Sequence, residues 1–238
     1  MENTDLTFKT SKKTALPGEA HLSKRLFRLA ELISPCRRIV DIGCDHGRLD
    51  LYMLLSGNAE RALMTDLHEG PCRRAREMIR RYDLENRAEL LCCNGLGERQ
   101  LEAGDRLVIA GLGGLEISSI LSRLSFPEDF SAVFQPNWNQ AALRTHLASR
   151  GWSFEEEILE DRGWFYLFIR LLSPSKPREL SLIEAEIGPC WLKRGEKQFT
   201  ETERAYFRRQ RRLFQMKARK YPEFTSVARK LAELPAML

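Results

Sequence analysis

Residues 38–50 read RIVDIGCDHGRLD and carry the pattern of a buried strand, a glycine turn and a helix. The apolar residues within 39–42 are typical of a strand that is covered on both faces of a parallel sheet. Gly43 and Gly47 interrupt this run, and apolar residues then recur at helical spacing from Leu49. A glycine turn between a strand and a helix lets the backbone approach a bound cofactor closely.

The acidity of this turn indicates which cofactor it could take. Asp41 and Asp45 place two carboxylates at the turn, where a pyrophosphate would be repelled. A cofactor with an ammonium and a sulfonium group, S-adenosylmethionine, suits it better. NAD-binding turns prefer Gly-x-Gly-x-x-Gly, whereas this one reads Gly-x-x-x-Gly. The alternative is an ordinary acidic turn, because short glycine motifs also occur by chance.

A second strand is predicted at residues 61–66, and it ends in Asp66-Leu67. Asp66 lies nineteen positions after Gly47. A strand-end acid about 20 residues beyond the glycine turn accepts hydrogen bonds from a ribose, which adenosylmethionine shares with NAD. We therefore predict that Asp66 binds the ribose, although an exposed acid at a strand end is also common.

Three more strands are predicted at residues 88–93, 105–110 and 131–135, with helices at 70–82, 115–124 and 139–150. The first ends in Asn94-Gly95-Leu96, where Asn94 could hydrogen-bond the adenine edge or only form a turn. The second ends in Gly111-Leu112-Gly113-Gly114, where something must approach the backbone closely. The third ends in Gln135-Pro136-Asn137, whose two amides could hold a target base or tie up the turn.

Alternating strands and helices predict a doubly wound α/β domain with a parallel sheet. Residues 152–160 and 163–172 favour an antiparallel pair at its edge. We divide the chain into a loose arm (1–20), a Rossmann-like domain (21–173) and a C-terminal helical, coiled-coil-like domain (174–238), which begins at the linker 173–177.

The turn resembles the signature of the bacterial tRNA adenine-N1-methyltransferases that modify position 22 in the D arm. That family reads Asp-Ile-Gly-Ser/Thr-Asp-His-Ala/Gly-x-Leu-Pro at this place, and it also has Ile-Ala-Gly-Met-Gly-Gly and Gln-Pro-Asn further on. The chain departs from the family in three places: it has Asp50 in place of Pro, Leu112 in place of Met, and Leu167 where the family often has an acid near the start of the last strand.

The resemblance implies a class I adenosylmethionine-dependent methyltransferase that acts on N1 of an adenine in tRNA. It implies candidate catalytic residues at Asp45, His46, Gln135 and Asn137. The implied cofactor-binding residues are Asp41, Gly43, Asp45, His46, Gly47, Asp66, Leu67, Asn94, Gly95, Leu96, Gly111, Leu112 and Gly113.

Basic residues are concentrated near the C-terminus. Residues 176–238 hold fifteen Lys/Arg and eight Asp/Glu, a net charge of +7, so the other residues carry −2 of the total of +5. Residues 204–220 hold eight basic residues and no acid, with apolar residues at helical spacing. This favours nucleic-acid binding over a solvated face. The predicted tRNA-binding residues are Lys24 and Arg25, within a helix at 22–33 that could instead be a lid, and Arg208, Arg209, Arg211 and Arg212.

The composition sets further expectations. The six cysteines lack metal-binding spacing, so we expect buried, reduced thiols of a cytoplasmic protein and no metal. No apolar run reaches the eighteen or so residues of a membrane span, and no N-terminal apolar segment suggests secretion. We expect a monomer or weak dimer. A methyltransferase of another RNA or of a small molecule, and a non-catalytic RNA-binding protein, stay open. An exocyclic-amine DNA methyltransferase is disfavoured, because its motif is missing.

Overall fold

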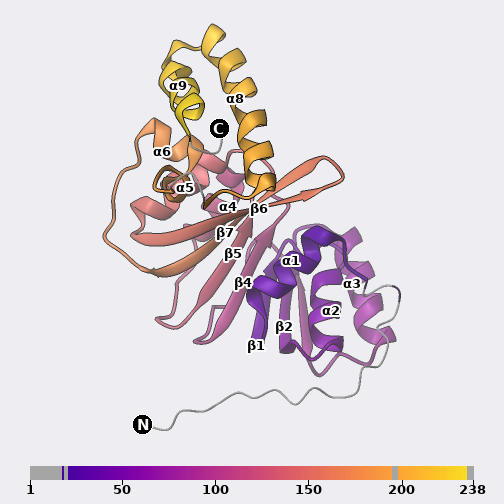
Figure 1. Cartoon of the computed structure of the whole chain (residues 1–238). Coiled ribbons are helices and arrows are strands. Elements are labelled where there is room, and N and C mark those ends of the chain that lie inside the picture. The colour runs from indigo at the N-terminus through magenta and orange to yellow at the C-terminus, as the bar shows by residue number, and fades with distance from the viewer. Residues whose placement is uncertain (1–17, 19–20, 195–197, 235–238) are drawn as a thin grey trace.

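The computed structural model describes residues 18, 21–194 and 198–234, so the arm predicted at 1–20 lies, apart from Gly18, outside the described residues. A seven-stranded sheet forms the centre, with helices on both faces (Figure 1). Its strands are β1 (Cys36–Ile42), β2 (Ala59–Asp66), β3 (Ala88–Cys92), β4 (Asp105–Ala110), β5 (Ser131–Gln135), β6 (Trp152–Asp161) and β7 (Trp164–Pro174).

The strand order is β3-β2-β1-β4-β5-β7-β6. The first five strands of the chain pair in parallel, and β7 pairs antiparallel with both β5 and β6. Because the chain moves outward from β1 to β3 and returns to β4 on the other side of β1, the order reverses between β1 and β4. Ligands of doubly wound sheets bind at such a reversal, outside the carboxyl ends of the strands. The predicted fold class is confirmed.

The helices match the predicted periodicity to within a few residues. Ser23 caps the first helix, because its hydroxyl accepts a hydrogen bond from the Leu26 amide at 3.4 Å. The helices are α1 (Lys24–Ile33), α2 (Arg48–Leu55), α3 (Glu69–Arg81), α4 (Gly114–Leu121), α5 (Gln140–Ser149), α6 (Leu182–Ile187), α7 (Pro189–Leu192), α8 (Glu201–Lys220) and α9 (Thr225–Glu233), and the short 3₁₀ helix Pro222–Phe224 joins the last two.

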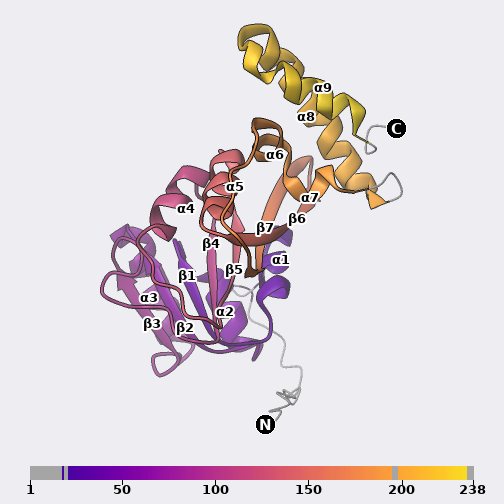
Figure 2. The ribbon, with the colours of Figure 1, turned by 90° about the vertical axis from the view of Figure 1, so that its left-hand side faces the viewer.

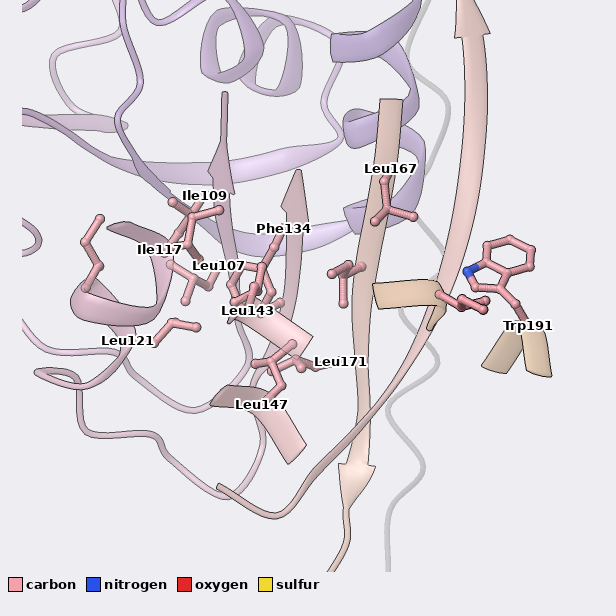
Figure 3. Close-up of a cluster of buried hydrophobic side chains, with 14 of the residues drawn as sticks. Leu107, Ile109, Ile117, Leu121, Phe134, Leu143, Leu147, Leu167, Leu171 and Trp191 are labelled. Carbon is pink, nitrogen blue, oxygen red and sulfur yellow. The ribbon is translucent and has the colours of Figure 1, made fainter. Parts of the chain in front are cut away.

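Two apolar layers hold the sheet between the helices. On one face, α1, α2 and α3 pack through residues such as Leu29, Leu54 and Ile79. On the other face, α4 and α5 pack on Ile109 and Phe134 (Figure 3). Both faces of the central strands are therefore buried, which is why β1, β4 and β5 each contain a run of mainly apolar residues.

The C-terminal helices share the second layer. Trp191, Phe207, Phe214 and Leu231 belong to the same apolar cluster as the sheet residues, and Figure 3 draws Trp191 with this cluster. The helix that carries it, α7, contacts β6. From this base α8 and α9 extend together beyond the sheet (Figures 1 and 2). The boundary at residue 173 stays a prediction, and it falls where β7 ends.

A buried ion pair joins α5, β6 and α6 beneath these helices. Arg144 Nε donates to Glu156 Oε1 at 2.6 Å, and Nη1 donates to the carbonyls of Ala185 and Glu186 at 2.8 and 3.0 Å. Both charged side chains are almost fully buried. Such a pair fixes the geometry of the elements it connects, because a misplaced partner leaves a charge uncompensated in a dry interior.

All six cysteines are free thiols. The expectation that they are buried is wrong for Cys92, which is exposed, and Cys93 and Cys190 are half-buried. Cys92 is the last residue of β3, at the open edge of the sheet. Among the described residues, no helix is both long and apolar enough to cross a bilayer. No group of three or more His, Cys, Asp or Glu side chains in the same residues could hold a metal ion.

Candidate cofactor site

A cavity of about 350 Å³ opens at the carboxyl ends of β1, β2 and β4, at the reversal of strand order. Its size lies within the ~300–1,000 Å³ range of small-molecule sites. α1 closes one side, and the two glycine turns form the walls. The lining residues are Arg25, Leu26, Leu29, Asp41, Gly43, Cys44, Asp45, His46, Arg48, Leu49, Asp66, Ala110, Gly111, Leu112 and Asn137.

The turn after β1 adopts left-handed backbone at three positions, with φ of +83° at Gly43, +54° at Asp45 and +68° at Gly47. A Cβ on Gly47 would lie 2.3 Å from Cε of Met64, so this glycine serves the packing of the turn on β2. Gly47 does not line the cavity, whereas Gly43 does. The two glycines thus have different roles: Gly47 lets the turn close, and Gly43 leaves backbone open to a ligand.

Asp66 fixes the turn from the end of β2. Its Oδ2 accepts the Asp45 amide at 3.0 Å, and its Oδ1 accepts the His68 amide at 2.9 Å. A carboxylate offers about four acceptor sites, so the two amides leave capacity for ribose hydroxyls. The position predicted for Asp66, on the cavity wall at the end of the second strand, is the one observed.

Arg74 constrains His46. The Arg74 Nη1 atom lies 2.7 Å from Nε2 of His46, and Nδ1 of the same ring lies 2.9 Å from Oδ1 of Asp45. Because arginine can only donate, Nε2 is the acceptor of this hydrogen bond. Nδ1 lies close to the Asp45 carboxylate but has no hydrogen-bond partner. His46 is thereby a fixed wall residue whose basic nitrogen is already engaged.

A chain of hydrogen bonds runs from α1 to the second glycine turn. Arg25 Nη1 donates to Gln135 Oε1 at 2.7 Å, Gln135 Nε2 donates to Asn137 Oδ1 at 3.1 Å, and Asn137 Nδ2 donates to the Gly111 carbonyl at 2.7 Å. Gln135 is buried and does not line the cavity, whereas Asn137 does. Arg25, which was predicted to hold tRNA, points into the cavity, 5.9 Å from the Tyr166 ring centroid. Lys24 lies 3.8 Å from Asp161 on the outside.

Trp138, which the sequence patterns did not single out, covers the turn after β4. Its ring packs on Gly113, where an added Cβ would lie 2.4 Å from the indole Nε1. The side chain is nevertheless 56% exposed, beside Asn137 at the end of β5. Its position directly after Gln135-Pro136-Asn137, at the predicted strand end, is the signal in the sequence that could have found it.

The residues predicted to surround the adenine lie apart from the main cavity. Asn94, Gly95 and Leu96 line a separate cavity of about 410 Å³ between the β3 end and α4. Asn94 Oδ1 accepts a hydrogen bond from Arg123 Nη2 at 3.1 Å. Leu67 lies outside both cavities and is 61% exposed. The structure therefore brings Asp41, Asp45 and Asp66 together with the Gly111 turn in one cavity. The residues predicted to surround the adenine, Asn94–Leu96, line a different cavity at the carboxyl end of β3.

Carboxylates dominate the electrostatics of the cavity. Burial raises the pKa of Asp41 to about 7, although a hydrogen bond from Asp50 and the charge of Arg25 act in the opposite direction. Asp45 and Asp66 add further negative charge. Such walls stabilise a ligand that carries positive charge.

The fold and this acidic, glycine-walled cavity define a methyltransferase domain of the doubly wound type. Residues 22–169 match the family model described as a methyltransferase domain, and the chain belongs to this family. Its resemblance to the bacterial tRNA adenine-N1-methyltransferases is confirmed by the relatives that it matches.

Over 154 residues the chain is 31% identical to the tRNA (adenine(22)-N(1))-methyltransferase of Bacillus subtilis, a match that spans 63% of this chain and 64% of that enzyme. An uncharacterized protein from Listeria monocytogenes superposes with a TM-score of 0.71 at 27% identity and covers 91% of this chain and 97% of its own. The M. capricolum protein TrmK, solved with S-adenosyl-homocysteine, shares the fold with a TM-score of 0.73 at 21% identity, over 90% of this chain and 97% of its own.

Proposed function

We propose that this protein transfers a methyl group from S-adenosylmethionine to N1 of an adenine in tRNA, at position 22 of the D arm. The observation that carries the proposal is the cavity at the strand-order reversal, which combines an open glycine turn with Asp41 and Asp66. The match to the Bacillus enzyme supplies the substrate class.

The residues present fit this cofactor. Asp41 faces the cavity with a carboxylate for the ammonium group, and Asp66 has acceptor capacity for the ribose. A Cβ on Gly111 would fill cavity space 3.7 Å from Arg25 Nη1, so glycine keeps that space open. When bound, the cofactor supplies the electrophilic methyl group. We propose Leu67 and Asn94–Leu96 as the further wall on the adenine side.

Methyl transfer to N1 makes modest chemical demands on the chain. The N1 lone pair of adenine is available at neutral pH, so attack needs no general base, which agrees with the engaged state of His46. The base becomes cationic as the sulfonium becomes neutral, and Asp41 and Asp45 stabilise that positive charge. The main contribution is then alignment, which can supply about 7–11 kcal/mol. Asn137 and the exposed Trp138 ring offer the unpaired base a hydrogen-bonding group and a stacking surface.

Asp66→Ala should weaken the binding of S-adenosylhomocysteine by roughly 1.5–3 kcal/mol, the worth of hydrogen bonds to a charged group. The loss combines the missing ribose acceptor with the release of the Asp45 and His68 amides. Isothermal titration calorimetry measures this loss of affinity. The control is Glu69→Ala, which removes an exposed carboxylate three residues away. Unchanged affinity in Asp66→Ala would contradict the proposal that Asp66 binds the ribose of the cofactor.

We propose that α8 carries the main tRNA-binding surface. Arg208, Arg209 and Arg212 are exposed on this helix and Arg211 is half-buried, while Tyr206, Phe207 and Phe214 attach its other side to the core. Arg208 contacts Glu201 at 2.6 Å, an exposed pair that contributes little to stability and can yield to a phosphate. The helix thus presents positive charge on a rigid support.

Replacing Arg208, Arg209, Arg211 and Arg212 by alanine should raise the KM for tRNA and flatten its salt dependence. Each lost phosphate contact should reduce the slope of log affinity against log salt by roughly 0.7–0.9. Filter binding at several salt concentrations measures this.

A matched control for that variant removes four exposed arginines elsewhere, Arg37, Arg61, Arg73 and Arg80, and gives the same net charge. Affinity for S-adenosylhomocysteine should stay unchanged in both. If the two variants lose tRNA affinity equally, the effect is one of net charge and α8 is a solvated face.

Mass spectrometry of tRNA nucleosides after incubation with protein and labelled adenosylmethionine tests the reaction itself. The expected product is labelled 1-methyladenosine in tRNA that contains an adenine at position 22, and no label in tRNA that lacks it. Label on another nucleoside would replace the substrate assignment. No label, with tRNA still bound, would favour a non-catalytic RNA-binding protein.

We also propose that the protein works in the cytoplasm as a monomer or weak dimer. Six free thiols support a reducing compartment. Sedimentation at several concentrations measures the oligomeric state.

A further inference from the structure

Two carboxylic acids meet below the cavity. Asp41 belongs to β1 and lines the cavity at 5% exposure, and Asp50 lies in the first turn of α2 at 0% exposure. Their side chains are in hydrogen-bond contact. With both groups ionised, neither oxygen of Asp50 has a donor. A single proton on Asp50 gives one of these oxygens a partner, because its hydroxyl can then donate to Asp41.

The surroundings of the pair favour that proton. Arg25 of α1 attracts Asp41, while Asp45 of the turn and Asp66 of β2 repel a second negative charge there. Beside Asp50 the neighbouring ionisable groups are the thiols of Cys36 and Cys44, which burial keeps protonated by raising their pKa. Burial and the charge of Asp41 likewise raise the pKa of Asp50 well above its ordinary value. Two adjacent buried carboxylates would be very costly.

We propose that Asp50 keeps its proton in the folded protein and donates it to Asp41, so that the pair presents one negative charge to the cavity. Asp50 is then a positioning residue that holds Asp41 toward the ammonium group of the cofactor, and this last step rests on the proposed function. A proline, usual in the family at this place, has no hydrogen to give. The hydrogen-bond donor is therefore a feature of this chain.

The pH dependence of unfolding tests the protonation state without cofactor. An acid whose pKa is higher in the folded than in the unfolded state binds more protons when folded, so stability falls as pH rises from about 4 through the folded pKa. Asp50→Asn mimics the protonated acid and cannot ionise. The Tm of Asp50→Asn minus that of the wild type should therefore increase from pH 5 to pH 8. A difference independent of pH, or one that shrinks, would overturn the proposal.

Calorimetry with S-adenosylhomocysteine tests the positioning role. Asp50→Asn keeps a donor for Asp41 and should bind within about threefold of wild type, whereas Asp50→Leu should bind about tenfold more weakly or worse, because Asp41 loses its partner. Equal loss in both variants would mean that the acid itself is needed, and it would overturn the role. If the wild type binds no S-adenosylhomocysteine at all, the proposed function fails instead, and the unfolding experiment still decides the protonation state.

Discussion

Gly114→Ala is expected to lower the rate of methyl transfer by about 100-fold or more. A Cβ at this position would lie 2.0 Å from the carbonyl oxygen of Asn139, a backbone atom that cannot rotate away. The turn after β5, which carries Asn137 and Trp138, must therefore move. A misplacement of about 1 Å in a substrate-positioning group can cost on the order of 100-fold in rate. Single-turnover assays with saturating tRNA and adenosylmethionine measure the effect.

Gly113→Ala is the matched control for that prediction. The three atoms nearest to its Cβ would all belong to the indole of Trp138, an exposed side chain that can move aside. It should therefore lose less activity than Gly114→Ala, and Trp138→Ala should lose activity through weaker tRNA binding. Circular dichroism should show folded protein in all three. An active Gly114→Ala variant would mean that the turn relaxes freely and that its glycine is not needed for positioning.

Arg144→Leu is expected to destabilise the protein by about 3–5 kcal/mol, the usual cost of leaving one member of a buried ion pair alone. Glu156 would lose its cationic partner while 3% exposed, and the carbonyls of Ala185 and Glu186 would lose their donor. Urea denaturation followed by tryptophan fluorescence measures the loss, because Trp191 is buried in the apolar cluster on which α5 packs.

A double-mutant cycle separates the ion pair from the packing. Arg144→Leu with Glu156→Leu removes both charges, so it should be less destabilised than the sum of the two single variants. Arg170→Leu, which breaks an exposed pair with Glu155 on the same sheet edge, should cost less than about 1 kcal/mol. Additive losses in the cycle would show that the two buried side chains act independently.

The sequence by itself determined the order and type of the elements in the Rossmann-like domain, because a strand buried on both faces and a helix buried on one face have different hydrophobic periods. It did not predict α6, α7 and α9 individually. The run at 39–42 and the glycines that follow predicted β1 and its turn, and the strand ends predicted Asp41, Asp45 and Asp66 on one wall. Parallel strands bring their carboxyl ends to one edge, so these short patterns were enough. The resemblance added the substrate class, which no periodicity contains.

Only the tertiary structure decided how side chains from distant elements use that edge. Arg25 reads as a surface charge of a helix, yet the packing of α1 over the cavity turns it toward Gln135, 110 positions away. Asn94 follows a strand like Asp66 does, but β3 lies at the margin of the sheet and opens on a second cavity. Asp50 occupies an ordinary helical position, and only the packing of α2 on the sheet buries it beside Asp41. A local sequence pattern shows which face of one helix or strand is buried. These contacts instead join residues far apart in the sequence, so they depend on how the helices and strands pack against one another.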